Sequence, residues 1–258
     1  MTQSFSRIFA FAATTALGAS ASVLFGGTAA AQVGSSVNIQ QIGLDQTAVV
    51  SMDAGNATAI AQSGGNNTAT VLISGGVGNG LTDGSVSQSG QNDTAAIIVD
   101  GDDNAFAVSQ SGAGAENSLT LVQDGSSNRA DITQDATGLS SGLANTATLT
   151  QVGTGNSVSL SQTSLMAGVG TFNNRAVMFQ AGDNNVSNLI QDGRNNDAEQ
   201  TQVGDSNTSV ILQTGDDNLA IHRQYGDNLG LPADASGIMI SQSGGASVMI
   251  EQYAPGTR

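Results

Sequence analysis

An eleven-residue repeat constrains what this chain can fold into more than any other feature of its sequence. From residue 174 to residue 228 the pattern N-x-[AS]-x-φ-x-Q-x-G-x-x occurs five times without interruption, where φ is usually aliphatic. An internal period of this kind is typical of architectures in which each unit is one copy of the same small structure. The candidate structural residues are the three types that recur at this interval, namely Asn174, Asn185, Asn196, Asn207, Asn218, Gln180, Gln191, Gln202, Gln213, Gln224, Gly182, Gly193, Gly204, Gly215 and Gly226.

The spacing within one unit predicts a β-strand followed by a tight turn. The Asn, the small residue, the aliphatic residue, the Gln and the Gly lie two positions apart, so a strand places all of them on one face. Ile211 is therefore expected to point inward and Thr208 outward. A helix would spread the same positions around its axis. The G-x-x-N link supplies turn residues, because Gly adopts positive φ and Asn and Asp tolerate a left-handed backbone.

A second, longer period predicts how these strands are arranged. About 18 units can be followed from Ser35 to Gln252, and in the first seven the Gln position alternates between Gln and an apolar residue. Alternate units are thus equivalent neighbours, which predicts two strands per coil and a repeat of 22 residues. The predicted fold is all-β, a flattened parallel β-solenoid of about nine two-strand coils that spans about 40–45 Å. Inward aliphatic residues would form a dry layer, and inward Gln and Asn would form ladders along the axis.

The composition agrees with a stack of thin coils. The chain has 34 Gly, no Trp and no Cys, and aromatic residues make up 3% of it, so it lacks the large side chains of an ordinary core. In a solenoid each repeat buries its face against its neighbours, and Ala, Val and Ile are sufficient for that.

Residues 1–31 are predicted to be a secretory signal peptide, and residues 32–258 the repeat domain. Arg7 is followed by an apolar run from Ile8 to Leu24, and three alanines at 29–31 offer a small-residue cleavage site. The alternative is a membrane anchor, for which the run is short. No later stretch is apolar enough to cross a bilayer, so the expected location is secreted, either extracellular or at the cell surface.

Charge argues against two classes of partner. The net charge is −15, and residues 32–258 hold 21 acidic residues against five Arg and no Lys. Nucleic acid and anionic membrane surfaces are therefore not expected as partners.

The spacing of Gln, Gly and Asn resembles the curlin repeat of bacterial curli fibres. Examples are Gln62-x-Gly64-x-x-Asn67-x-Ala69, Gln123-x-Gly125-x-x-Asn128-x-Ala130-x-Ile132-x-Gln134 and Gln151-x-Gly153-x-x-Asn156, in addition to the run that begins at Asn174. The resemblance covers nearly all of residues 32–258. It implies a secreted subunit that polymerises outside the cell into amyloid fibres for adhesion and the biofilm matrix. It also implies an outer-membrane secretion channel, a periplasmic chaperone and a nucleator subunit as partners.

Other functions were weighed from the residues themselves. Asp-rich turns such as Gly101-Asp102-Asp103-Asn104 could bind calcium, although the nonapeptide of calcium-binding β-rolls is absent. Solvated turns that keep fibres apart are the other interpretation. Enzymatic roles are disfavoured, because His222 occupies an inward aliphatic position and the acids do not converge. No cofactor or metal is expected. A monomeric β-solenoid adhesin or surface-binding protein remains the alternative to a fibre subunit.

Two further expectations concern the ends and the inward exceptions. The repeats begin by Val37 and reach Gln252, which predicts uncapped edges at both ends of the stack. Gln200 and His222 replace the inward aliphatic residue in two units of the same sheet, one coil apart, so they are predicted to hydrogen-bond each other. Longer spacers interrupt the rule at five places: 75–82, 112–117, 136–145, 164–174 and 226–236. The second, third and fourth are predicted on one edge of the solenoid, the first and fifth on the other.

Overall fold

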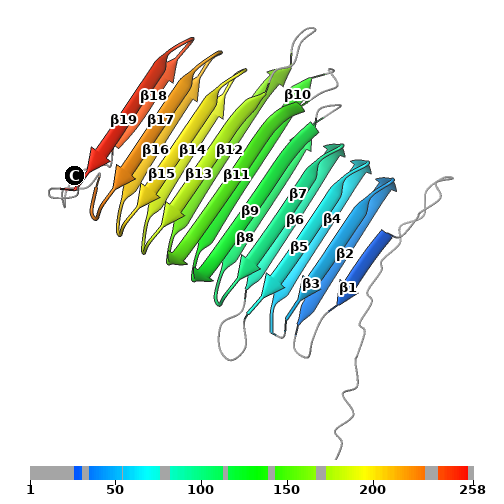
Figure 1. Ribbon diagram of the computed structural model, residues 1–258. Helices are drawn as coiled ribbons and strands as arrows, with labels where there is room; N and C mark the ends of the chain where they lie inside the picture. Colours follow the sequence, from blue (N-terminus) through cyan, green and yellow to red (C-terminus); the bar gives the residue numbers. More distant parts are fainter. Residues whose placement is uncertain are drawn as a thin grey trace, which may run out of the picture.

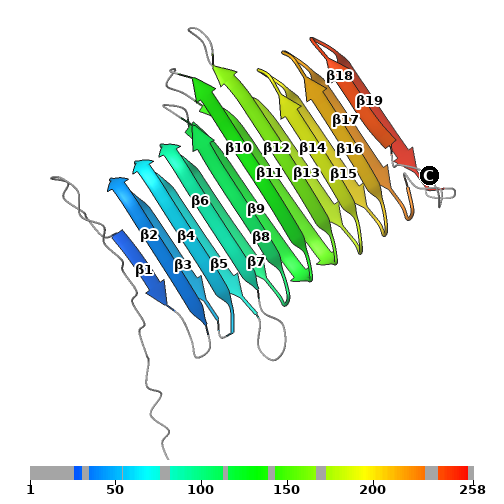
Figure 2. The ribbon, with the colours of Figure 1, turned by 180° about the vertical axis from the view of Figure 1, so that it is seen from behind.

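The computed structural model describes residues 26–30, 35–53, 55–75, 82–112, 116–138, 143–166, 173–229 and 238–254. Within these ranges the regular structure consists of β-strands arranged in two sheets. The strands stack side by side in two layers, from β1 at one end to β19 at the other (Figure 1). The same order is visible from behind (Figure 2).

The strands alternate between the two sheets along the chain. Sheet A has ten strands, which are β1 (Gly26–Ala30), β3 (Thr47–Met52), β5 (Thr68–Ser74), β7 (Thr94–Asp100), β9 (Glu116–Ser126), β11 (Leu143–Thr154), β13 (Asn174–Ala181), β15 (Asp197–Val203), β17 (Leu219–Tyr225) and β19 (Ser247–Tyr253). Sheet B has nine strands, which are β2 (Ser36–Leu44), β4 (Ala57–Gly65), β6 (Asp83–Gln91), β8 (Ala105–Gly112), β10 (Arg129–Gly138), β12 (Ser157–Met166), β14 (Val186–Asp192), β16 (Thr208–Thr214) and β18 (Ile238–Ser243).

This topology confirms the predicted two-strand coil. Every pairing within a sheet is parallel and joins strands one coil apart, as in β14 beside β16. The register keeps equivalent residues together, for example Ala176 beside Ala198 and Gln180 beside Gln202. The 18 predicted units correspond to β2–β19, which pair off into nine coils.

The core is a layer of small and aliphatic side chains between the sheets. Ile211, Leu189 and Leu149 are completely buried, and the apolar residues at the equivalent positions of the other strands from β3 to β18 are buried as well. Burying one such side chain stabilises the fold by roughly 1.5–3 kcal/mol. Ile211 therefore faces inward as predicted, whereas Thr208 is partly exposed on the outer side of β16.

Phe106 is an exception to the small side chains of this core. It is buried on β8, directly beside Gly84 of β6 in the register. A Cβ atom at residue 84 would lie 2.0 Å from the Phe106 ring, so the glycine makes room for the aromatic ring.

The order of the strands agrees with the predicted edges for the long spacers. The second, third and fourth spacers connect sheet B to sheet A, since they follow β8, β10 and β12. The first and fifth connect sheet A to sheet B, after β5 and β17. The spacers themselves lie largely outside the described residues.

Strand β1 was not expected. It lies within the predicted signal segment and pairs with β3 at the end of sheet A. The rest of that segment, residues 1–25 and 31, is outside the described ranges. Within the described part of the chain, the structure has no helix long and apolar enough to cross a membrane.

Candidate functional site

Two ladders of buried Gln side chains run along the axis of the solenoid. In each rung the amide nitrogen of one Gln donates to the amide oxygen of the Gln one coil later, at 2.7–3.0 Å. The sheet B ladder contains Gln41, Gln62, Gln88, Gln110, Gln134, Gln162, Gln191, Gln213 and Gln242. The sheet A ladder contains Gln123, Gln151, Gln180, Gln202, Gln224 and Gln252.

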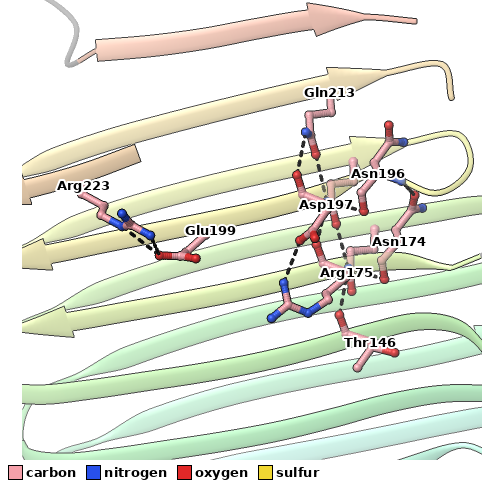
Figure 3. Close-up of polar contacts among 10 residues, drawn as sticks. Thr146, Asn174, Arg175, Asn196, Asp197, Glu199, Gln213 and Arg223 are labelled. Carbon is pink, nitrogen blue, oxygen red and sulfur yellow. Dashed lines mark hydrogen bonds and ion pairs between the residues drawn. The ribbon is translucent and has the colours of Figure 1, made fainter. Parts of the chain in front are cut away.

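These ladders have a direction and they also join the two sheets. The donor of every rung belongs to the earlier coil and the acceptor to the later one. The same amide nitrogen also donates across the core, as Gln213 does to the backbone oxygen of Asp197 at 3.0 Å (Figure 3). A Gln within the ladder therefore satisfies its buried amide by contacts that only a correctly stacked neighbour provides.

The first coils of sheet A lack this ladder. Met52, Ile73 and Val99 occupy the Gln positions of β3, β5 and β7 and are buried. As a result Gln123, the first Gln of sheet A, has no donor for its buried amide oxygen.

The Asn residues clamp the turns of neighbouring coils. The side-chain oxygen of Asn185 accepts the backbone N–H of Asn207 at 3.0 Å, and its amide nitrogen donates to the Gly204 carbonyl at 2.7 Å. Asn174 and Asn196 bond in the same way to the next coil (Figure 3). All five Asn of the central run are buried, so sequence reasoning placed them on the correct face. Many of their bonds are to the backbone, whereas amide-to-amide ladders were expected.

The repeated Gly residues allow the turns to stack closely. The five Gly from Gly182 to Gly226 all have positive φ, between 81° and 128°. A Cβ atom at Gly204 would lie 2.3 Å from the carbonyl oxygen of Gly226 in the next turn. The glycine is therefore required for the contact between coils as well as for the turn.

Asp93 interrupts one of the Asn columns. It lies between Asn67 and Asn117 in this column and is completely buried. One carboxyl oxygen accepts from the backbone and side-chain nitrogens of Asn117, at 3.1 and 2.9 Å, and the other oxygen has no partner. Burial raises the pKa of Asp93 to about 6, although the hydrogen bonds from Asn117 act in the opposite direction.

The predicted hydrogen bond between Gln200 and His222 is wrong, although the two residues are neighbours. They are register partners on β15 and β17, as the two-strand coil required. Ser209, from the opposite sheet, bridges them. Its hydroxyl oxygen lies 2.9 Å from the Gln200 amide nitrogen and 2.6 Å from His222 Nδ1. The two side chains are therefore connected through the Ser209 hydroxyl group.

His222 lies between polar side chains of both sheets, Ser209 of sheet B and Gln252 of sheet A. It is buried, its Nε2 lies 3.2 Å from the Gln252 amide oxygen, and burial lowers its pKa. Among the described residues no group of three His, Cys, Asp or Glu side chains is placed to hold a metal ion.

Ion pairs cross neighbouring coils on the outer faces and turns. Arg175 pairs with Asp197 at 2.8 Å, and Arg223 pairs with Glu199 at 2.8 Å (Figure 3). Arg223 also pairs with Glu251, at 3.1 Å. Arg194 pairs with Asp216, which lowers the pKa of that carboxyl group. Such exposed pairs contribute little to stability, typically 0–1 kcal/mol. They do favour the correct stacking order, because opposite charges meet only in this register.

Acidic residues of the turns bind the backbone of the preceding turn. Asp183, Asp205 and Asp227 form one such column on the C-terminal half of the stack. Asp205 accepts the backbone N–H of Asp183 at 2.8 Å, and Asp227 accepts that of Asp205 at 2.9 Å. From the sequence these turns are interpreted either as calcium-binding or as solvated. Their role as acceptors for backbone N–H groups was missed.

The two ends of the stack leave core side chains partly uncovered. Val37 and Ile39 of β2, and Val248 and Ile250 of β19, pack against the core but are only partly buried. Among the described residues, Gln41 has no donor to its amide oxygen, and Gln242 lacks the rung to a later Gln that its predecessors make. The ladder thus lacks a donor for one further rung at the first end and an acceptor for one further rung at the other.

A comparison with known protein families agrees with the spacing. A search of curated proteins finds no sequence that matches this chain. Residues 193–226, which include β15, β16 and β17, match the family model described as the curlin associated repeat. The resemblance to the curlin-repeat family is thereby confirmed on this stretch, and the same Gln, Asn and Gly positions recur in the coils on both sides of it.

Proposed function

We propose that this protein is the structural subunit of a homopolymer in which copies stack end to end as a curli-like fibre. The observation that supports this most directly is the pair of unfinished ends. β2 and β19 leave core residues partly uncovered, and the sheet B ladder ends at a Gln41 oxygen that accepts no rung and at a Gln242 amide nitrogen that donates to backbone carbonyls but to no later Gln.

The direction of the ladder sets how copies would meet. Because every rung donates from the earlier coil to the later one, Gln242 of one copy would donate to Gln41 of the next. Such a contact joins two different surfaces, and a head-to-tail contact that does not close generates a filament. Parallel, in-register strands perpendicular to the axis are also the geometry of cross-β fibres.

The wider biology in this proposal comes from the curlin resemblance. It comprises export from the cell, amyloid fibres at the cell surface, and a role in adhesion and the biofilm matrix. The nucleator subunit, the chaperone and the outer-membrane channel belong to the same proposal. It assigns no catalytic role, since His222 is buried beside Ser209 and Gln252.

A monomeric adhesin is the second candidate, and one observation favours it. Both Asn columns end in residues without a side-chain amide, where the backbone N–H groups of Leu229 and Ala246 donate the last bonds to the side-chain oxygens of Asn207 and Asn218. A turn that cannot clamp a following turn is a weak form of cap.

Polymerisation of residues 32–258 tests the two candidates against each other. The purified chain would be incubated with an amyloid dye, with and without preformed seeds, while its mass is followed by light scattering. A lag phase that seeds abolish, together with fibres that give reflections at about 4.8 and 10 Å, supports the fibre subunit. A monodisperse monomer that persists for days with seeds present would overturn the proposal in favour of the adhesin.

A further inference from the structure

Strand β1 occupies one of the edges that a second copy would need. Gly26–Ala30 pair in parallel with Thr47–Ser51 of β3, and β1 is the terminal strand of sheet A at this end (Figure 1). The opposite end of sheet A is β19.

The alternation of sheets fixes which strand of a second copy would lie beside β3. Successive strands alternate between sheets, so the strand after β19 in an uninterrupted stack lies in sheet B and is β2 of the next copy. The strand after that is β3 of the next copy, which must pair with β19. Within one copy, β1 already holds that position.

The two competing strands differ in length and composition. β19 has seven residues, and its repeat register would place Val248 beside Ala48 and Ile250 beside Val50, with apolar residues in both partners facing inward. β1 has five residues, two of them Gly, and leaves Met52 without a partner from β1. Gly weakens a strand, because it loses more backbone entropy and offers no side chain to pack. β19 is therefore the better partner for β3, although Gln252 would meet Met52 and would gain no rung there.

We propose that β1 is a detachable strand that shields the β3 edge, and that displacing it opens this end to β19 of a second copy. This inference rests on the proposed end-to-end fibre. The expected cleavage after Ala31 would remove residues 26–30, so that the chain gains its second binding end only when the leading segment is lost. A strand edge that would otherwise template pairing is thereby covered inside the cell.

The test compares full-length chains that differ only in β1. Replacing Thr28 and Ala29 together with Pro removes two consecutive backbone N–H groups, one of which must belong to the parallel ladder. Thr28→Val keeps the N–H group and favours a strand, so it is the matched control. Residues 32–258 serve as the reference without β1. Seeded growth of all four is followed with an amyloid dye.

The expected result is rapid growth of the Pro variant and of residues 32–258, with slow growth of the unmodified chain and of Thr28→Val. If β1 is detached in about a tenth of the molecules, the apparent affinity of β19 for the β3 edge is about tenfold lower than in a chain without β1. Equal growth of all four would overturn the shielding by β1 and leave the fibre proposal standing. Growth of residues 32–258 alone would also overturn it, since the block would then lie elsewhere in residues 1–31. No growth of any form would overturn the fibre itself.

A crosslink can identify the edge that is used. The chain has no Cys, so Val49→Cys in one batch and Met249→Cys in another, both with the two Pro substitutions, introduce one thiol each. These residues are outward neighbours in the proposed register, and register neighbours lie within the Cα distance that a disulfide spans. Mixed fibres should yield a disulfide-linked dimer under mild oxidation, whereas Val210→Cys mixed with Met249→Cys should not. Absence of the first dimer from fibres would place the junction away from β3.

Discussion

Asp93 stands in a column of Asn residues, and this one substitution in the pattern has a measurable consequence. At this place in the column an Asn would accept with its oxygen and donate with its amide nitrogen, whereas an ionised Asp has only acceptors and leaves one buried oxygen without a partner. Burial disfavours the ionised form and so raises the pKa of Asp93 from 3.8 to about 6, and protonation gives the carboxyl group an O–H donor. The contribution of Asp93 to folding is then fully present below about pH 4 and is lost as the pH rises through about 6.

Asp93→Asn is expected to stabilise the protein at neutral pH and to have little effect in acid. The shift in pKa corresponds to at most about 3 kcal/mol, and the gain should fall towards zero near pH 4. Urea unfolding of both proteins at about pH 7.5 and about pH 4.5 measures this difference.

His222 acts in the opposite direction, because its lowered pKa costs stability as the pH falls below 6.5. Its contribution is present in both proteins and cancels in the comparison. A gain that does not vary with pH would contradict the assignment.

Ser209→Ala is expected to destabilise the fold more than the same change at Ser187. Both serines are buried at inward positions of sheet B, so the loss of volume is matched. Ser209 bridges Gln200 and His222, and its removal leaves His222 Nδ1 without a partner, at a cost of about 1–3 kcal/mol. Ser187 donates only to Gln202, whose oxygen keeps its bond from Gln180, so that change should cost less than about 1 kcal/mol. Denaturant midpoints of the two variants decide the matter, and equal losses would argue against the bridge.

At the scale of strands and turns, the sequence predicts most of the structure because local spacing and stacking obey the same rule. Alternation placed Ile211 inward and Thr208 outward, and the two-unit period identified Gln200 and His222 as neighbours in one sheet. The Ser209 bridge could not be predicted, since it depends on how far an inward side chain reaches across the core. β1 was missed because Gly26–Ala30 lack the repeat pattern and read as part of a signal peptide.

The stacked turns make a prediction about glycine. Gly204→Ala should be considerably more harmful than Gly244→Ala, although both residues have positive φ, at 115° and 64°. A left-handed backbone costs about 1–2 kcal/mol in a residue with a side chain, and this should be the whole effect at Gly244, which has open space around its Cβ position. At Gly204 the added Cβ also meets the Gly226 carbonyl and must push two coils apart. Thermal unfolding should show the larger loss at Gly204, and similar losses would mean that the coils can separate without cost.

At the scale of the molecule, the solenoid behaves as a one-dimensional stack. Each coil contacts only its neighbours, so stability is roughly the sum of coil and interface terms, and a copy added at an end gains one more interface of the same kind. The partly buried Val37, Ile39, Val248 and Ile250 mark where that interface is missing. What opposes the addition is charge, because two copies with a net charge of −15 over the full chain repel each other.

Fibre growth is therefore expected to accelerate with salt, and to depend on acids near the ends more than on acids in the middle. Raising the ionic strength from about 0.01 M to about 0.15 M shortens the screening length from about 30 Å to about 8 Å and should raise the elongation rate from seeds.

At low salt Asp53→Asn should raise the elongation rate more than Asp183→Asn. Each variant removes one charge and keeps a side-chain oxygen for the backbone N–H that its carboxylate now binds. Asp53 directly follows β3 at the proposed junction, whereas Asp183 lies several coils away. Dye kinetics with residues 32–258 at both salt concentrations measure this. Equal rates for the two variants at low salt would place the growing junction elsewhere than at the end that contains β3.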